Sequence, residues 1–349
     1  MELVNHSPVA AQLRVSSVEH TDARYGLVIA KATFVVGDDG TATLDTQNPC
    51  PIFELDEPTL LGLMPADIVP RRDPALEVIT LGNAHGHGRT HMQVELALGQ
   101  HRQSLLVYGD RHWTGPRRGA EISEPTPIDI LPLTWDRAHG GSCECWIDEH
   151  SVIDLEHPMN KYGRGFDPGK LAVDLGKAFH APAGYPRLAP GHRRCLPNLE
   201  DPRHPIDGWS DDPRPYCWAT LPTDIGAHTQ RAHDRVRDHH PMSPEEMLRM
   251  VYHRAHPDWI VPVPPAGATV TLKGMTPRGT WSFRLPRLRV LADYELGGRT
   301  GTRELAPQLL MLLPEQSRCY LVYRHFFTMQ VTSGMHRSLR LRLAEGWIS

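Results

Sequence analysis

Histidine is the residue type in this chain with the greatest capacity for chemistry. Three of the 21 histidines, His85, His87 and His91, lie close together in the sequence. Neutral imidazole binds zinc, and a zinc-bound water with Asp110 as base would make a metal-dependent hydrolase. A second group follows later: His228, His233, His239 and His240. Neither group has a familiar ligand spacing such as His-Glu-x-x-His, so we expect no metal and keep the hydrolase as the alternative function.

Other patterns that could support chemistry are incomplete. One residue separates Cys143 from Cys145, whereas zinc knuckles use two to four, so we expect buried structural thiols. The run from Gly163 to Lys170 resembles a phosphate loop only superficially, because its glycines are wrongly spaced and Leu171 follows the lysine. No Gly-x-Ser-x-Gly elbow occurs. The sequence therefore predicts no catalytic residues and no cofactor.

Composition argues against several classes of partner. The net charge of -4 and the pI near 6.6 give no electrostatic reason to expect nucleic acid or an anionic membrane. No run of 18 apolar residues occurs, and the first residues lack the basic start and apolar run of a signal peptide. We therefore expect a cytoplasmic protein that does not insert into membranes, with free thiols.

Two short segments bring an acid, an arginine and a tryptophan together. They are residues 108–113 (Tyr-Gly-Asp-Arg-His-Trp) and 135–137 (Trp-Asp-Arg). In each, the aspartate can accept hydrogen bonds from the arginine while the guanidinium lies over an aromatic ring, which would make a chain corner rigid. Tryptophan and arginine are also enriched at protein interfaces. These corners are therefore either structural or the rim of a protein-binding surface.

Alternating hydrophobicity predicts β-strands towards both ends of the chain. Residues 27–36 and 41–44 predict a hairpin around Gly-Asp-Asp-Gly, and residues 92–98 and 104–108 predict another across a Gly-Gln turn. Six later segments also have strand character: 269–272, 280–285, 288–296, 309–313, 318–327 and 338–343. Short strands at regular spacing favour sandwich-like antiparallel sheets.

Between about residues 141 and 260 prolines recur and strands are hard to place. We predict a proline- and histidine-rich region of ordered loops there, with a short helix near 243–253 that Ser243 caps and Pro244 begins. The fold class is thus mainly β with a few short helices. Its predicted parts are an N-terminal β region (1–140), this middle region (141–260) and a C-terminal sandwich-like region (261–349), the two β regions being either separate or one continuous domain.

Seven short blocks of sequence carry a resemblance to a known family. They are residues 2–8 (ELVNHSP), 31–34 (KATF), 109–113 (GDRHW), 132–141 (PLTWDRAHGG), 163–166 (GRGF), 196–202 (LPNLEDP) and 283–286 (FRLP). In this order and spacing they resemble the bacterial type VI secretion adaptor family, long catalogued only as a domain of unknown function. The resemblance covers nearly the whole chain. It implies a cytoplasmic adaptor or chaperone that helps load a toxic effector on the VgrG/PAAR spike, without turnover chemistry.

We therefore predict a non-enzymatic adaptor that acts by protein-protein contact with a secreted effector, with spike proteins or with both. The candidate partner-binding or motif residues are Trp113, Trp135, Asp136, Arg137, Arg164, Asn198 and Asp201, of which Trp113, Trp135, Arg137 and Arg164 are the expected anchors. No catalytic, metal or cofactor-binding residue is predicted. A structural subunit of a larger assembly is a third possibility, distinguished by stable stoichiometric co-purification.

Overall fold

The computed structural model describes residues 2–17, 23–68, 75–115, 119–189, 195–222, 253–296, 299–330 and 337–344. In this part of the chain the protein is mainly β, as predicted, with one α-helix and three short 3-10 helices. The α-helix has ten residues, and the described residues contain no helix long and apolar enough to cross a membrane. The predicted helix near 243–253 and the later histidine group lie outside the described residues.

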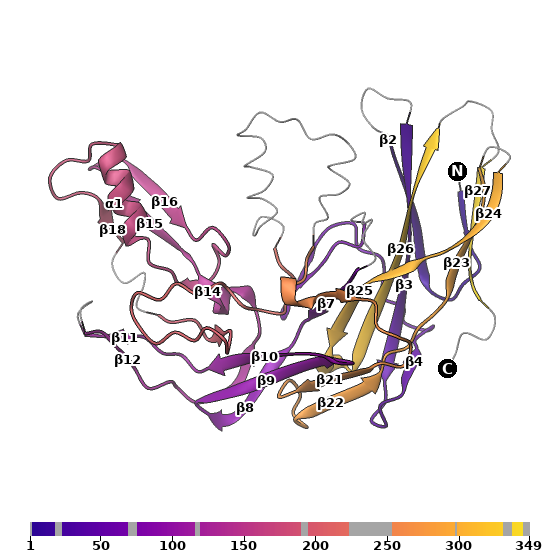
Figure 1. Cartoon of the computed structure of the whole chain (residues 1–349), viewed down its shortest axis with the longest axis horizontal. Helices are drawn as coiled ribbons and strands as arrows, with labels where there is room; N and C mark the ends of the chain where they lie inside the picture. The colour runs from indigo at the N-terminus through magenta and orange to yellow at the C-terminus, as the bar shows by residue number, and fades with distance from the viewer. Residues whose placement is uncertain are drawn as a thin grey trace.

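The largest sheet combines strands from both ends of the chain (Figure 1). Its spatial order is β2 (Ala10–Ser17), β3 (Ala23–Val36), β26 (Arg318–Gln330), β25 (Ala306–Leu313), β7 (Ala75–Thr80) and β20 (Ile260–Pro262), with β4 (Ala42–Leu44) also paired to β3. The long strands β3 and β26 are antiparallel neighbours along thirteen residue pairs. The N-terminal and C-terminal β regions thus share one sheet.

Two further sheets also mix early and late segments. The five-stranded sheet has the order β19 (Leu199–Glu200), β10 (His101–Tyr108), β9 (His91–Leu98), β21 (Thr269–Lys273) and β22 (Thr280–Arg284). The four-stranded sheet has the order β1 (Glu2–Asn5), β27 (Arg337–Leu343), β23 (Val290–Leu296) and β24 (Arg299–Glu304). The predicted hairpins are confirmed as β3–β4 and β9–β10, and the six predicted C-terminal strands are β21, β22, β23, β25, β26 and β27.

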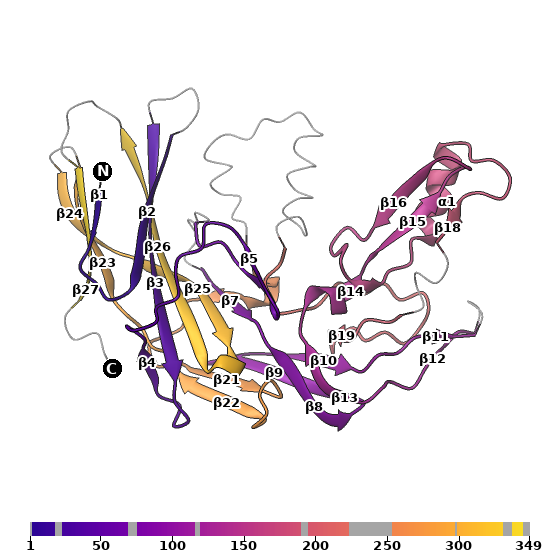
Figure 2. The same cartoon turned by 180° about the vertical axis from the view of Figure 1, so that it is seen from behind.

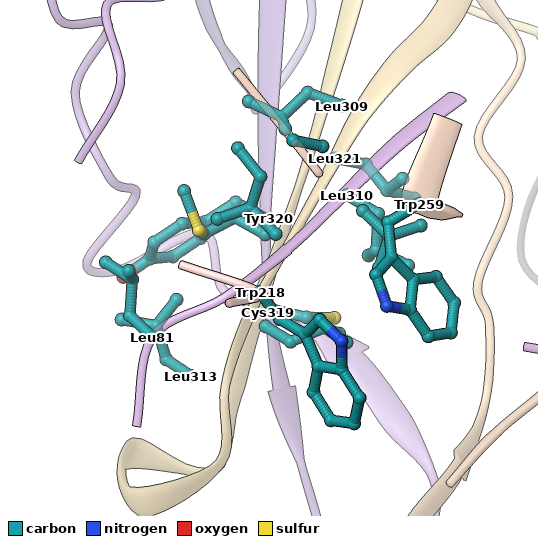
Figure 3. Close-up of a cluster of buried hydrophobic side chains, with 14 of the residues drawn as sticks. Leu81, Trp218, Trp259, Leu309, Leu310, Leu313, Cys319, Tyr320 and Leu321 are labelled. Atoms are coloured by element: carbon teal, nitrogen blue, oxygen red, sulfur yellow. The ribbon is translucent and has the colours of Figure 1, made fainter. Parts of the chain in front are cut away.

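One hydrophobic core joins these three sheets. It contains inward-facing residues of each, such as Leu321 of the large sheet, Leu105 of the five-stranded sheet and Leu341 of the four-stranded sheet. Figure 3 shows part of it, where Trp218 and Trp259 lie beside leucines of β25 and β26. The two indole rings pack edge to face with centroids 6.0 Å apart. Burial of these large side chains is the main term that stabilises the fold.

Small strand pairs complete the described structure. They are β5 (Glu57–Thr59) with β6 (Gly62–Met64), β8 (Asn83–Arg89) with β13 (Ile128–Pro132), β11 (Trp113–Thr114) with β12 (Glu121–Ile122), and β14 (His139–Gly140) with β17 (Arg164–Gly165). The 3-10 helices are η1 (Trp135–Arg137), η2 (Pro257–Trp259) and η3 (Pro314–Gln316).

Residues 141–189 form an arm that projects from the sheets, as both views show (Figures 1 and 2). The arm contains a sheet of β16 (Val152–Glu156), β15 (Ser142–Trp146) and β18 (Arg187–Leu188), and the helix α1 (Gly169–Ala178). Its own small core includes Cys145, Leu155 and Ala172. The prediction of ordered loops with one short helix near 243–253 therefore missed the strands and the helix α1 of the arm. The reason is that β15 contains few β-branched residues and α1 begins after Pro168 without a side-chain cap.

Candidate functional site

Four of the seven blocks meet at the foot of the arm. They come from the end of β10, from η1, from β17 and from the segment that contains β19, which hydrogen bonds join. Figure 2 shows β10 and β19 beside β14, the strand that pairs with β17. We call the polar residues at this junction the motif cluster: Tyr108, Asp110, Arg111, Asp136, Arg137, Arg164, Asn198 and Glu200. Residues up to 90 positions apart in the sequence are bonded there.

Asn198 is the centre of the motif cluster and is fully buried. Its Nδ2 donates to the Tyr108 carbonyl at 3.0 Å and to Asp110 Oδ1 at 3.0 Å, and its Oδ1 accepts from Arg137 Nη1 at 3.1 Å. Its backbone N–H donates to the Arg137 carbonyl, and its carbonyl accepts from Tyr108 N–H, both at 2.8 Å. One side chain therefore ties two chain corners together, and a satisfied buried network of this kind is rigid.

Arg111 and Glu200 form a buried ion pair beside Asn198. The Arg111 guanidinium lies 3.7 Å from the centroid of the Tyr108 ring, and Arg111 Nη2 also donates to the Pro197 carbonyl at 3.3 Å. Glu200 Oε2 accepts from the Ile206 N–H at 3.1 Å. Burial raises the pKa of Glu200, and the neighbouring guanidinium acts in the opposite direction. These contacts fix the corner after β10.

The predicted contact between a guanidinium and an aromatic ring is confirmed in the first corner, where Arg111 lies over Tyr108, but the predicted Asp–Arg pairing is wrong in both corners. Arg111 pairs with Glu200 and not with Asp110, and Arg137 donates to Asn198 and not to Asp136. The two aspartates instead lie on the surface, where Arg164 approaches both. Its guanidinium nitrogens are 3.7 Å from Asp110 Oδ1 and 3.8 Å from Asp136 Oδ2, and its Nε donates to the Asp136 carbonyl at 3.0 Å. The solvent-accessible part of the motif cluster is thus an arginine between two carboxylates.

The two tryptophans expected to anchor a partner are buried, so this expectation is corrected. Trp113 is 3% exposed and packs on Leu196 and on Trp209, with the two indole centroids 5.5 Å apart. Trp135 is 7% exposed and donates from Nε1 to the Ala219 carbonyl at 3.0 Å. Because a partner cannot reach buried rings without displacing this packing, both indoles serve the fold.

Asp201 is also buried, and its carboxylate is bonded to a side chain of the protein itself. Its Oδ1 accepts from Arg203 Nε at 2.8 Å and its Oδ2 accepts from Arg203 Nη2 at 2.8 Å, while Arg203 Nη2 also donates to Asp258 Oδ2 at 2.6 Å. This bidentate geometry holds the turn after β19. Of the seven candidate residues, Asp136, Arg137 and Arg164 keep side-chain surface that a partner can reach.

The three other blocks lie in the sheets. Lys31 is buried on β3 and donates to Asp67 at 2.8 Å, with its ammonium 4.2 Å from the centroid of the Phe53 ring. Asn5 donates to the Val9 carbonyl at 2.8 Å, and Phe283 belongs to the main core. These residues stabilise the sheets and are distant from the arm in the fold.

Of the histidines proposed for the alternative hydrolase, the described ones, His85, His87 and His91, do not form a group that could hold an ion, although the His85 and His87 ring centroids are 6.4 Å apart. His85 Nε2 lies 3.2 Å from Glu315 Oε1, and the His91 ring stacks on Tyr108 with centroids 6.1 Å apart. His87 has a left-handed backbone, with φ of 51°. In the residues that the structure describes, a different trio could hold an ion, namely His139, His157 and Asp212. Sequence analysis missed this trio because 73 residues separate His139 from Asp212.

The hydrogen bonds of His157 oppose metal binding by this trio. His157 Nδ1 accepts backbone N–H groups of Met159 at 3.2 Å and Asn160 at 3.1 Å, so this nitrogen carries no proton. The proton of the neutral imidazole is then on Nε2. To bind a metal, Nε2 would need a free lone pair, and a metal-binding histidine usually carries its proton on the other ring nitrogen and donates it to a hydrogen-bond acceptor. His139 Nε2 lies 2.8 Å from Asp212 Oδ1. The geometry favours a hydrogen-bonded structural group.

The buried His157 predicts a pH dependence of stability. Burial, followed by repulsion from His139, lowers the pKa of His157 from 6.5 to about 4. His157 therefore takes up a proton near pH 6.5 in the unfolded chain but only near pH 4 in the folded chain. Protonation of the unfolded chain thus lowers the free energy of unfolding as the pH falls from about 6.5 to about 4. At pH 5 the loss is about 2 kcal/mol.

A variant separates this contribution from that of other groups. In His157→Asn the amide oxygen replaces Nδ1 as acceptor for the two backbone N–H groups but does not titrate. Urea unfolding at pH 7 and pH 5 is expected to show a smaller pH difference for His157→Asn than for the unmodified chain. His256, whose pKa burial also lowers to about 4, contributes equally to both proteins. Equal pH differences in the two proteins would contradict this assignment.

The cysteines behave as the sequence analysis expected. Cys143 and Cys145 face the interior of the arm, and burial raises the pKa of both thiols. All six cysteines are free. A buried protonated thiol is a poor nucleophile and a poor metal ligand, so Cys143 and Cys145 act as small apolar residues.

Comparison with known proteins gives a match to one family. The model of a family described as an uncharacterized protein conserved in bacteria (DUF2169) matches residues 21–324. Comparison with curated proteins and with solved structures found no match. The matched range contains the whole arm and every residue of the motif cluster.

Proposed function

The chain belongs to the bacterial protein family DUF2169, and within that family we propose for it the role of a non-enzymatic cytoplasmic adaptor or chaperone. It binds a type VI secretion effector by protein-protein contact and helps load it on the VgrG/PAAR spike. The ordered resemblance of the seven blocks to the secretion adaptor family supports this proposal. The described fold adds a projecting arm on a rigid foot, which is a geometry suited to holding and presenting another protein.

The observation that carries the proposal is that the motif residues are bonded to one another. The amide of Asn198 is shared among three partners, and the Glu200 carboxylate is shared between Arg111 and a backbone N–H. A catalytic group must instead be presented to substrate with an open approach. The blocks thus make a frame, and surfaces carried by the frame are available for a partner. A standard interface buries roughly 1,600 Å² in total.

Co-purification tests the proposed role. The full chain with an affinity tag, expressed together with the effector and spike proteins of the same secretion system, is expected to retain one effector through size-exclusion chromatography. The matched control is the same chain with an effector from an unrelated secretion system. Recovery of neither effector nor spike protein, with the chain folded, would contradict the adaptor role. A permanent stoichiometric complex with the assembled machine would instead indicate the structural subunit.

The metal-dependent hydrolase is the second candidate, because His139, His157 and Asp212 lie within reach of one ion. Elemental analysis of the purified chain separates the two functions. The adaptor role predicts less than stoichiometric zinc, iron or manganese. A hydrolase predicts about one ion per chain, lost in His139→Ala, with substrate turnover that is lost in the same variant.

A further inference from the structure

The β15–β16 hairpin of the arm carries a local excess of negative charge. Residues 142–156 contain five acidic side chains and no lysine or arginine, so their formal charge of -5 exceeds in size the charge of -4 of the entire chain. Glu149 of the turn is exposed, as are the three acids of the strands, Glu144, Asp154 and Glu156. None of these three carboxylates has an ion-pair partner among the described residues. This charge is available to an incoming partner.

The acids share one face of the hairpin with two exposed apolar side chains. Cross-strand pairing places Glu144 opposite Asp154, Trp146 opposite Val152, and Ser142 opposite Glu156. Trp146 is 39% exposed and Val152 is 47% exposed. Alternate residues face the other way, so Cys145 and Leu155 pack towards α1. We call the outer side, with Glu144, Trp146, Val152, Asp154 and Glu156, the acidic face.

The strand β16 also has a free edge beside the acidic face. It is the last strand of its sheet in the described structure. The Ile147 N–H donates to the Ser151 carbonyl and the His157 N–H donates to the Gly141 carbonyl, each at 2.9 Å. These two bonds show which residue pairs of the hairpin are hydrogen-bonded pairs. Because bonded and non-bonded pairs alternate in an antiparallel ladder, Val152, Asp154 and Glu156 turn their N–H and C=O groups outward. Such an edge is a template for another strand.

We propose that the free edge of β16 and the acidic face bind an extended, lysine- or arginine-bearing segment of the protein partner as an added β-strand. Strand addition satisfies the outward N–H and C=O groups of Val152, Asp154 and Glu156. Alternate basic side chains of the added strand then lie over the acidic face, where they meet Asp154 and Glu156 and can reach Glu144 and the Trp146 ring.

The position of charges favours this occupant. Arg187 of β18, the nearest basic residue paired with the hairpin, lies opposite Trp146 on the side of β15 away from β16, and its guanidinium is 4.6 Å from the Tyr185 ring centroid. The charged side chains that β16 exposes along its free edge are thus two acids, Asp154 and Glu156. That the partner is the secreted effector rests on the proposed function, whereas the docking chemistry rests on the arm.

Peptide binding to the full chain tests the docking chemistry. The probe is a fluorescent nine-residue peptide of alternating lysine and threonine, with a glutamate-threonine peptide as the control for charge. We expect the lysine peptide alone to bind, measured by fluorescence anisotropy at low salt. Asp154→Lys with Glu156→Lys is expected to weaken binding at least tenfold. The matched double variant Glu57→Lys with Glu124→Lys changes two exposed acids elsewhere and is expected to bind as the unmodified chain does.

A second pair of variants separates strand addition from simple charge attraction. Asp154→Pro and Asp154→Asn remove the same charge, but only proline removes the outward N–H at the edge, where the hairpin itself loses no hydrogen bond. We expect Asp154→Pro to bind the lysine peptide at least tenfold more weakly than Asp154→Asn does, with unchanged circular dichroism. Equal affinities of these two variants would overturn strand addition, and equal affinities of the two double-lysine variants would overturn the acidic face as the site.

The same variants distinguish failure of this inference from failure of the adaptor role. If the effector is retained equally by Asp154→Pro, by Asp154→Asn and by the unmodified chain, the adaptor role stands and the arm edge is not its docking site. If no effector is retained by any of them while the lysine peptide binds as described, the adaptor role fails and the edge still accepts basic strands.

Discussion

Replacing Arg111 with methionine is expected to lower the free energy of unfolding by about 3 to 5 kcal/mol. The change leaves the Glu200 carboxylate buried without its guanidinium, while the Ile206 N–H still donates to it at 3.1 Å. Desolvation of an unpaired carboxylate is far more costly than the loss of an exposed pair. Urea unfolding at pH 7 measures the difference.

Two control variants test whether the loss of stability comes from the unpaired buried charge. Arg102 forms an exposed pair with Glu95 at 3.5 Å, and Arg102→Met is expected to change stability by less than about 1 kcal/mol. The double variant Arg111→Met with Glu200→Met removes both buried charges and is expected to recover a large part of the loss. If Arg111→Met and Arg102→Met proved equally stable, the buried pair would not hold the corner at the foot of the arm.

Gly140→Ala is expected to destabilise the protein by about 3 kcal/mol or more, because strain and overpacking add at this position. Gly140 has φ of 140°, and a Cβ there would lie 2.1 Å from the Asn160 carbonyl oxygen. Asn160 is fully buried and donates from Nδ2 to the carbonyls of Trp135 and His139, at 2.8 and 2.9 Å. The backbone at the foot of the arm must therefore shift.

Gly88→Ala is the matched control for this variant. Gly88 also has a positive φ, of 82°, but a Cβ would meet nothing within 4 Å. Its replacement is expected to cost about 1 kcal/mol from backbone conformation alone. Urea unfolding and limited proteolysis of the arm measure both variants. Similar stability for Gly140→Ala and Gly88→Ala would contradict the close packing of Gly140 on Asn160.

Strands with strong alternation could be predicted from sequence because one face must be buried. The leucines and arginines of β27 and the period of two in β9 indicate their faces directly. The arm could not be predicted in the same way. Its strands rely on Cys143 and Cys145 as inward residues, and α1 has no side-chain cap at its start. In the arm, tertiary packing determines the secondary structure, because the local sequence favours no one structure strongly.

The partners in the motif cluster depend on contacts that are distant in sequence. The local pattern suggested Asp110 as the partner of Arg111, but the fold supplies Glu200, 89 residues away. The sequence alone did not predict that four of the blocks meet in space, and it did not predict which of their side chains are paired. The burial of Trp113 and Trp135 has the same cause, since indoles are equally suited to interfaces and cores until the packing is known.

We propose that this protein carries another protein and performs no reaction itself. The most direct measurement is secretion of the effector by a bacterium that encodes this chain, with and without its gene. We predict that removal abolishes secretion of that effector while the machine still secretes other cargo, and that Asp154→Asn restores secretion more fully than Asp154→Pro. Unchanged secretion of every effector in the strain without the gene would contradict the claim.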